Sequence, residues 1–261
     1  MSRVLTLCFR ELRSQFVSPV AWTVGAGYLL LAGYFFFNLV AQFGILLGNY
    51  TVYAQVMQNP SLLDQVNLND VVIANLLRNL LVLFLFMVPA LTMRSFAEER
   101  KQGTDELLLT APVTPGQIVT GKFLGVLTLA GALVASSGVF ILILLRYGDP
   151  EKGPIWTGFL GLALAAAALV SLGIAVSAAT ESQVVAGVGS FVLFIVLFVV
   201  DQPAESAGEK LGAVLKALSL PQHFDNFDKG LVVGTDVAYY LSLIALGLFT
   251  ARAVVASQRW R

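Results

Sequence analysis

The sequence contains few of the residues from which most catalytic and metal sites are built. Of its 261 residues, only Cys8 is a cysteine and only His223 is a histidine. A disulfide framework and a histidine-rich metal site are therefore excluded. The sequence has no Walker-type Gly-rich loop, no GxSxG motif and no HExxH motif. Its formal net charge is zero, so it offers no basic field for nucleic acid.

Charge of either sign is also scarce. Charged residues make up 12% of the chain and hydrophobic residues 57%, whereas soluble domains are about one quarter charged. This composition is typical of a membrane protein. The three tryptophans, Trp22, Trp156 and Trp260, fall near expected membrane boundaries, where they act as interfacial anchors. The apolar stretch 20–41 is too long for the core of a cleavable signal peptide and is better interpreted as a first span.

Six segments meet or approach the roughly 20 apolar residues that a membrane-spanning helix needs. They are 20–41, 75–93, 117–145, 155–179, 184–200 and 236–256. Helix-start signals precede several of them. Ser18 stands before Pro19, Thr114 and Gln117 form a potential capping box around Pro115, and Thr235 offers a cap to the sixth span. We therefore predict an all-α membrane protein with six transmembrane helices, forming one domain over 1–261.

The distribution of lysine and arginine predicts the orientation of these spans. Ten of the sixteen bases lie near the N-terminus, in the loop 94–122 or near the C-terminus. These ten are Arg3, Arg10, Arg13, Arg94, Arg100, Lys101, Lys122, Arg252, Arg259 and Arg261. The long loop 42–74 has no base at all. Because cytoplasmic loops carry the excess of bases, both termini and the loop 94–122 are predicted to be cytoplasmic.

Two segments read as amphipathic helices outside the spans. In 3–17, Leu5, Cys8, Leu12 and Phe16 share one helical face, which favours a helix in the inner-leaflet interface over a frayed basic tail. The segment 205–235 mixes charges with apolar residues at helical spacing. It is predicted to form short amphipathic or re-entrant helices at the outer surface, broken at Pro221.

The most informative stretch is the polar loop between the second and third spans. Residues 96–102 are good helix formers with alternating charge, and Gly103 is suited to end that helix. Thr104 is placed to cap a second helix, in which Asp105 and Glu106 occupy the first turn and Leu107 follows. The loop is thus predicted to fold into one or two short cytoplasmic helices, with charged and apolar sides.

This stretch resembles the cytoplasmic signature of ABC-2-type transporter permeases. The resemblance rests on EERKQGTDELLL at 98–109, followed by Pro112-Val113 and Gly121-Lys122. Glu11-Leu12-Arg13-Ser14 with Ser18-Pro19, and Pro221-x-His223-Phe224, extend it over nearly the whole chain. Together they are most similar to the gliding-motility-associated permease subunits. Asp105 departs from the pattern, since an apolar residue is common there.

The resemblance implies the ABC-2, or type V exporter, fold and a place in the bacterial inner membrane. It implies a half-transporter that pairs with a second permease subunit, as a homodimer or a heterodimer, and with two ABC ATPase subunits. ATP and magnesium would bind to those partners, so this chain is expected to be a non-enzymatic exporter subunit without cofactor. The implied ATPase-coupling residues are Glu98, Glu99, Arg100, Gly103, Thr104, Asp105, Glu106, Leu107 and, as a second contact, Glu181.

Other readings remain open at this point. Glu98 to Arg100 can be a solvated face without a partner, and the chain can be an anchoring subunit that links an ATPase to envelope or motility machinery. A secondary transporter is disfavoured, because the spans 20–41, 75–93, 155–179 and 184–200 contain no acid for ion coupling. Arg78 lies at or inside the edge of the second span, where a base needs a partner or water. No polar cluster within the spans specifies a substrate.

Overall fold

The computed structural model describes residues 3–103, 113–206 and 208–258, and these form helices and turns without a strand. Six helical segments are long and apolar enough to cross a membrane. They are Pro19–Val56, Asn69–Lys101, Pro115–Tyr147, Lys152–Ala179, Gln183–Ala204 and Gly234–Gln258. The predicted all-α fold with six transmembrane helices is confirmed.

The individual helices follow one another with short connections. They are α1 (Arg3–Val17), α2 (Pro19–Val56), η1 (Pro60–Gln65), η2 (Asn69–Ala74), α3 (Asn75–Thr92), α4 (Ala97–Lys101), α6 (Pro115–Tyr147), α7 (Lys152–Ala179), α8 (Gln183–Val199), η3 (Gln202–Glu205), α9 (Glu209–Leu218), α10 (Leu220–Asp228) and α11 (Gly234–Gln258).

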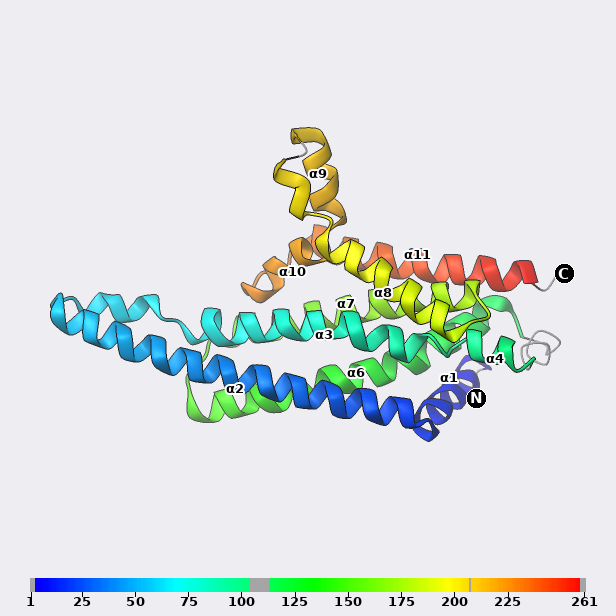
Figure 1. Ribbon diagram of the computed structural model, residues 1–261, viewed down its shortest axis with the longest axis horizontal. Coiled ribbons are helices and arrows are strands. Elements are labelled where there is room, and N and C mark those ends of the chain that lie inside the picture. The colour runs from blue at the N-terminus through cyan, green and yellow to red at the C-terminus, as the bar shows by residue number, and fades with distance from the viewer. Residues whose placement is uncertain (1–2, 104–112, 207, 259–261) are drawn as a thin grey trace.

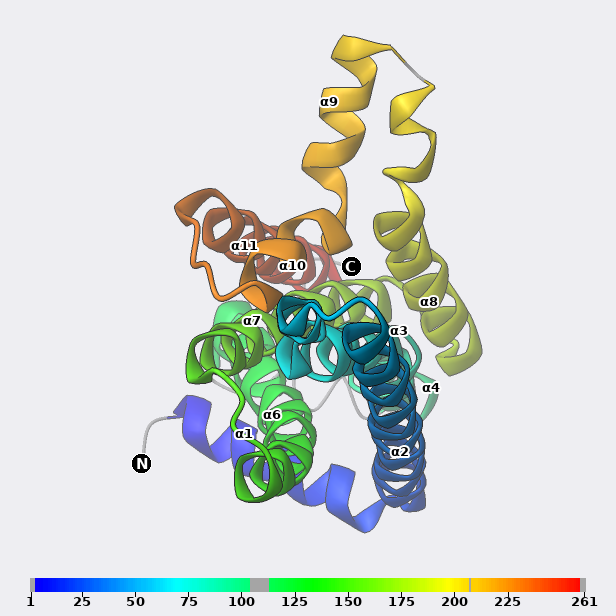
Figure 2. The same ribbon diagram turned by 90° about the vertical axis from the view of Figure 1, so that its left-hand side faces the viewer.

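The long helices form an elongated bundle (Figure 1). We call one end of it the α1 end, because α1 lies there together with α4 and the last turns of α11 (Figure 1). The opposite, distal end holds α10 and the far end of α2. Viewed from the distal end, α7 occupies the middle of the bundle (Figure 2). It contacts α3, α6, α8, α10 and α11, and most of its side chains are buried.

Helix α2 is much longer than the sequence predicted, since it continues past residue 41 to Val56. Its 38 residues correspond to about 57 Å at 1.5 Å per residue, whereas the hydrocarbon core of a bilayer is about 30 Å thick. The segment 42–74 is therefore not a loop. It consists of the end of α2, the short helix η1 that packs back against α2, and the π-helical turn η2 that leads into α3.

Several predicted helix boundaries are confirmed. The Ser18 hydroxyl accepts a hydrogen bond from the Val20 amide at the start of α2, and Thr114 and Gln117 form a complete capping box at the start of α6. Gly103, with φ of +66°, follows the end of α4. This left-handed conformation is accessible to glycine at little cost, which explains the end of the helix there.

Two boundary predictions are wrong. Helix α11 begins at Gly234, before Thr235, and Asp236 is buried inside its first turn. Pro221 does not break a helix but lies in the first turn of α10, where the Ser219 hydroxyl accepts a hydrogen bond from the Gln222 amide. Proline lacks an amide hydrogen and is tolerated at this position, where that hydrogen would have no helical partner. The two short helices predicted in 205–235 are present as α9 and α10.

The predicted N-terminal helix is also present as α1, but it buries a different face. Cys8 is buried, whereas Leu5 and Phe16, two other members of the predicted apolar face, are exposed. The buried face includes the polar residues Glu11 and Gln15. Burial of these side chains is tolerated because each has hydrogen-bond partners inside the protein.

Candidate functional site

The short helix α4 is anchored to the end of α7 at its N-terminus. The amides of Phe96 and Ala97 donate hydrogen bonds to the Ser177 hydroxyl oxygen at 3.1 and 3.3 Å. That hydroxyl in turn donates to the Met93 carbonyl at 3.1 Å. Ser177 thus satisfies two of the amides that a helix start leaves without intrahelical partners. The Arg100 guanidinium makes a further hydrogen bond, to the carbonyl of Ala178.

The first acid of α4, Glu98, is held by Arg94. The guanidinium of Arg94 donates to both carboxylate oxygens of Glu98, at 2.6 and 2.7 Å. Such two-point pairs are stronger and more directional than single hydrogen bonds. Arg94 also donates to the hydroxyl of Ser18, the residue that caps α2. Glu98 therefore faces the bundle and the start of α2.

The second acid, Glu99, joins α4 to two other helices. Its Oε2 lies 2.9 Å from the Lys122 ammonium of α6, and its Oε1 lies 2.8 Å from the Arg10 guanidinium of α1. Of these two contacts, the one with Lys122 is the more protected, since the Lys122 side chain is 3% exposed and that of Arg10 is 51% exposed. Exposed ion pairs contribute little to stability, so Lys122 is the dominant partner.

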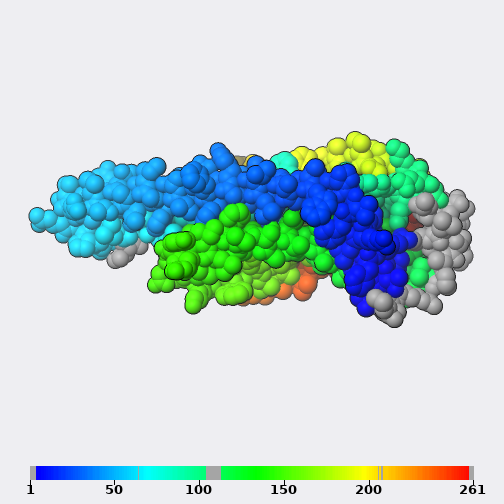
Figure 3. All heavy atoms as spheres, turned by 90° about the horizontal axis from the view of Figure 1, so that it is seen from below, coloured from blue at the N-terminus to red at the C-terminus, as the bar shows by residue number. Residues whose placement is uncertain are grey.

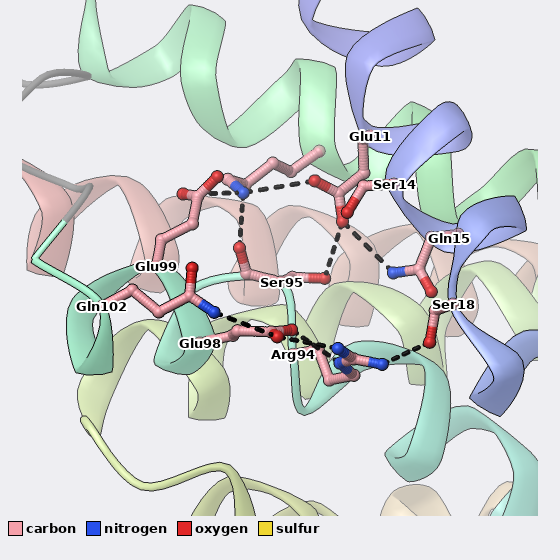
Figure 4. A pocket seen from close by; sticks show the side chains of 10 residues that line it. Glu11, Ser14, Gln15, Ser18, Arg94, Ser95, Glu98, Glu99 and Gln102 are labelled. Atoms are coloured by element: carbon pink, nitrogen blue, oxygen red, sulfur yellow. Dashed lines mark hydrogen bonds and ion pairs between the residues drawn. The ribbon is translucent and has the colours of Figure 1, made fainter.

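Lys122 is the centre of the arrangement, and its partners Glu11, Ser95 and Glu99 point toward one another in Figure 4. Besides Glu99, its ammonium contacts the Glu11 carboxylate at 3.2 Å and the Ser95 carbonyl. It also lies 4.9 Å from the centre of the Phe96 ring, within the range of a cation–π contact. Glu11 accepts further hydrogen bonds from Gln15 at 3.3 Å and Ser95 at 3.4 Å. The buried charge of Lys122 is therefore fully surrounded by acceptors.

Two glycines of α6 bring α1 close enough for these contacts. A Cβ atom on Gly121 would lie 2.6 Å from Cβ of Leu7, and one on Gly125 would lie 2.7 Å from Cβ of Glu11. Small residues four apart allow close helix approach. Because Lys122 follows Gly121 directly, this close approach places Glu11 of α1 beside it.

We call Arg10, Glu11, Arg94, Glu98, Glu99 and Lys122 the polar network. With three acids and three bases, it carries no formal net charge. A cavity of about 230 Å³ at the α1 end is lined by all members of the network except Arg10, and by the adjacent Ser14, Gln15, Ser18, Ser95 and Gln102. Among the described residues, no group of three histidine, cysteine or acidic side chains is placed to hold a metal ion. The chemistry of the network is ion pairing between α1, α4 and α6.

The predicted coupling residues fall into three groups. Glu98, Glu99 and Arg100 lie on α4 and make contacts within the chain, and Gly103 follows that helix. Glu181 is exposed in the turn between α7 and α8, both of which contact α4. The structure thus brings α4 and this turn into one region. Thr104, Asp105, Glu106 and Leu107 lie outside the described residues.

Three residues of this site, Lys122, Glu11 and Ser177, were not predicted from the sequence to act together. Lys122 was counted only as a base for orientation, although a base so close to an apolar segment requires a partner. That requirement was the available signal, and Glu11 is the partner to which it leads. Ser177 gave no signal, because a serine in an apolar helix most often bonds to its own helix.

A second polar cluster lies at the distal end and accounts for Arg78. Its guanidinium contacts Asp225 at 3.0 Å and Asp228 at 2.6 Å, both on α10. The Asp228 side chain is 1% exposed, and its Oδ1 has no hydrogen-bond partner among the described residues. Burial raises the pKa of the Asp228 carboxyl, although the hydrogen bond from Arg78 acts in the opposite direction.

His223 belongs to the same end of the bundle and bonds its neighbours. Its Nδ1 lies 2.7 Å from Asp236 of α11 and its Nε2 lies 3.2 Å from the Ala217 carbonyl of α9. Its ring stacks on Tyr239 with 4.0 Å between ring centres. Asn226 donates a hydrogen bond to the same Asp236 carboxylate at 2.8 Å. These contacts fasten α9 and α10 to α11.

The six apolar helices, with charged clusters gathered at the two ends of the bundle, define a multi-pass helical membrane protein. The chain belongs to the ABC-2 family: the family described as "ABC-2 family transporter protein" matches residues 9–227. It is therefore a permease, the membrane subunit of a transporter, in a family that generally works with an ABC ATPase. The match does not extend to the gliding-motility-associated subgroup. No curated protein is significantly similar to the chain in sequence.

Proposed function

We propose that this chain is the permease subunit of an exporter driven by a separate ABC ATPase that docks at the α1 end. In this proposal the α1 end is cytoplasmic, in a bacterial inner membrane, and the docking surface comprises α4, residues 103–107 and the turn at Glu181. The excess of bases near both termini and in 94–122 supports this orientation. The contact of α4 with the ends of α7 and α8 supports a single surface.

The observation that carries the proposal is the double pairing of Glu99. One carboxylate contacts a base of α1 and a base of α6, while the start of α4 is bonded to α7. A displacement of α4 by a docked motor therefore acts on three helices at once. The role of the acids is then to transmit motion within the chain, rather than to offer charge to the ATPase.

The proposed transporter contains more subunits than this chain. Two ATPase subunits, which bind ATP and magnesium, and a second permease subunit complete the transporter. Closure of the ATPases on ATP moves the two α4 helices and changes the access of the membrane helices. The resemblance of residues 98–109 to gliding-motility-associated permeases motivates a second candidate function. In this alternative the chain anchors an ATPase to envelope machinery and moves no solute.

Two sets of charge changes distinguish docking of the ATPase from transmission of its motion. One set alters exposed residues of the proposed docking surface, and the other alters an ion-paired residue of the polar network. Lys101→Glu with Glu181→Lys alters two exposed side chains of the surface, so we expect loss of co-purification with the ABC ATPase. Glu99→Gln should retain the ATPase but lose transport-coupled hydrolysis, because its ion pairs are broken. The matched control is Glu209→Lys, an exposed acid on α9.

Normal association and normal activity in the Lys101→Glu/Glu181→Lys protein would refute the docking surface. Stimulated ATP hydrolysis without movement of any solute would favour the anchoring role. The orientation is tested separately with Ser257→Cys near the C-terminus, in a chain whose Cys8 has been replaced by serine. Labelling of this thiol from the periplasmic side would refute the proposed topology.

A further inference from the structure

Helix α1 presents two exposed sides besides the buried side that faces α6. Leu5, Phe9 and Phe16 share one of them and are 46%, 58% and 49% exposed. Arg10 and Arg13 occupy the next side round the helix, and both are exposed. Figure 3 shows α1 in dark blue on the surface of the molecule, beside the start of α2. An apolar side next to a basic side is typical of a helix at a membrane surface, with its bases near the lipid headgroups.

The basic side of α1 lines an open pocket of about 510 Å³ at the junction with α2. Its polar lining consists of three arginines and two serines, without any described acid: Arg10, Arg13, Arg94, Ser14 and Ser18. Guanidinium groups present paired N–H donors in one plane, a geometry that matches the oxygens of a phosphate group. The lining of this cavity, which we call the arginine pocket, therefore fits a phosphate anion.

The three arginines differ in what they can offer to a ligand. All three guanidinium nitrogens of Arg94 already donate to other side chains of the protein, so this residue contributes charge alone. Arg10 uses one nitrogen for Glu99, and its side chain stays 51% exposed. The side chain of Arg13 forms no ion pair or hydrogen bond with any described residue. Arg10 and Arg13 are therefore the residues with donors left for a ligand.

Arg13 adds one positive charge to a polar network that is otherwise balanced. Within that network, Arg10, Arg94 and Lys122 are paired with its three acids. The phosphodiester group of a phospholipid carries a single negative charge, which would neutralise Arg13. A headgroup that also carries a cation, as in phosphatidylcholine, would restore the imbalance. The charge of the pocket therefore favours an anionic phospholipid.

The surroundings of the arginine pocket are those of a membrane boundary. Trp22 packs edge-to-face on Phe16, with 6.0 Å between ring centres, and its indole donates a hydrogen bond to the Phe16 carbonyl at 2.9 Å. Tryptophan is enriched at the level of the lipid headgroups. Phe16 and Trp22 line, with Leu129 and Leu133 of α6, an apolar groove of about 330 Å³. The two cavities adjoin, since Phe16 lines the groove and the next residue, Val17, lines the arginine pocket.

We propose that the arginine pocket binds the phosphate of an anionic phospholipid from the leaflet at the α1 end, with one acyl chain in the apolar groove. The phosphate oxygens accept hydrogen bonds from Arg10 and Arg13. A phospholipid fits both cavities, whereas a free anion or an acidic segment of another protein fits the arginine pocket alone. Because Arg10 also pairs with Glu99 of α4, a lipid bound here steadies that helix. The inference goes beyond the proposed function, since it requires a membrane at this end and no ATPase.

Native mass spectrometry of the purified, delipidated chain tests the site with defined lipids. Phosphatidylglycerol should bind, and phosphatidylcholine with the same acyl chains should bind much more weakly. Arg13→Gln should weaken binding of phosphatidylglycerol at least about tenfold, because it removes charge-assisted hydrogen bonds to the phosphate. The matched control is Lys101→Gln, which removes an exposed base of α4 outside the pocket and should bind the lipid as the unmodified protein does.

A second pair of variants tests the apolar groove. Ala26→Phe fills the groove and should weaken binding of phosphatidylglycerol, whereas Leu30→Phe, at an exposed position outside it, should not. Glycerol phosphate lacks acyl chains and should not displace the lipid at equal concentration. Displacement by it would show that the pocket takes a free anion and would overturn the proposal. Equal binding of the two lipids, or equal binding to the unmodified protein and to Arg13→Gln, would overturn it as well.

Co-purification of the ATPase is followed with the same variants. If Arg13→Gln binds phosphatidylglycerol normally but loses the ATPase, the pocket receives a segment of that protein and the lipid site is refuted. Lipid binding that depends on Arg13, in a chain that binds no ATPase, would refute the proposed function alone. A bound ATPase on a chain that does not distinguish the two lipids would refute the lipid site alone.

Discussion

Lys122 and Glu11, separated by 111 positions in the sequence, form an ion pair of 3.2 Å between α6 and α1. Both side chains are almost completely buried. A buried charge is tolerated only where its partners compensate for the lost hydration. This ion pair therefore joins α1 to α6 in addition to the close packing at Gly121 and Gly125.

The first prediction concerns the loss of the buried base. Lys122→Met removes the ammonium and leaves Glu11 buried without its cation, so we expect a loss of about 3–5 kcal/mol in the free energy of unfolding. Thermal unfolding in detergent measures it. Lys101→Met, at an exposed position of α4, should change stability by less than about 0.5 kcal/mol. Similar shifts in the two variants would contradict the role assigned to Lys122.

A second prediction uses Cys8 as a reporter of the contact between α1 and α6. Gly125→Leu places a side chain where Glu11 already lies, and overpacking of this kind costs about 1–3 kcal/mol. We expect α1 to move away from α6 and the buried Cys8 thiol to react faster with a maleimide. Gly131→Leu is the control, because a Cβ on Gly131 meets no atom within 4 Å. An unchanged rate in Gly125→Leu would show that α1 does not depend on this close approach.

The third prediction is a dependence on pH at the distal end. Arg78→Ala removes the base that partly offsets the burial of Asp228, and an unpaired buried acceptor costs about 1–3 kcal/mol. Burial raises the pKa of Asp228 in the folded protein, so the folded state binds a proton more readily than the unfolded state. The destabilisation should therefore be largest at neutral pH and shrink as the pH falls toward the ordinary value for aspartate, about 3.9.

The control for this effect is the double variant Arg78→Ala/Asp228→Asn, which has no carboxyl group at position 228. The difference in free energy of unfolding between this double variant and the unmodified protein should no longer depend on pH. Arg78→Ala with Asp225→Asn, which alters the more exposed acid of the pair, should retain it. The same pH profile in both double variants would show that Asp228 is not the responsible group.

Local sequence signals predicted the helices well. Long apolar runs identified six spans, Ser18 and Thr114 marked two helix starts, and Gly103 marked the end of α4. These features depend on residues close together in the chain. The extension of α2 to Val56 was not predicted, because residues 42–56 carry enough polar groups to resemble a loop while remaining compatible with a helix.

The candidate site was predicted only in part, for a physical reason. Glu98 and Glu99 were located correctly between two spans, and their charge suggested a soluble partner. Their actual contacts, Arg94, Arg10 and Lys122, depend on how α1 and α6 pack, and two of these bases are far away in the sequence. Ion pairs between distant segments leave no periodic pattern by which a single sequence would reveal them.

The close packing of α7 limits which helices can move during transport. A Cβ on Gly247 of α11 would lie 2.6 Å from the Ser171 carbonyl carbon of α7, and one on Gly173 of α7 would lie 2.4 Å from the Thr92 hydroxyl of α3. At such contacts one helix cannot turn about its axis without driving atoms into its neighbour. Helices α3, α7 and α11 therefore form one closely packed unit, in which rotation of any single helix about its own axis is opposed by its neighbours.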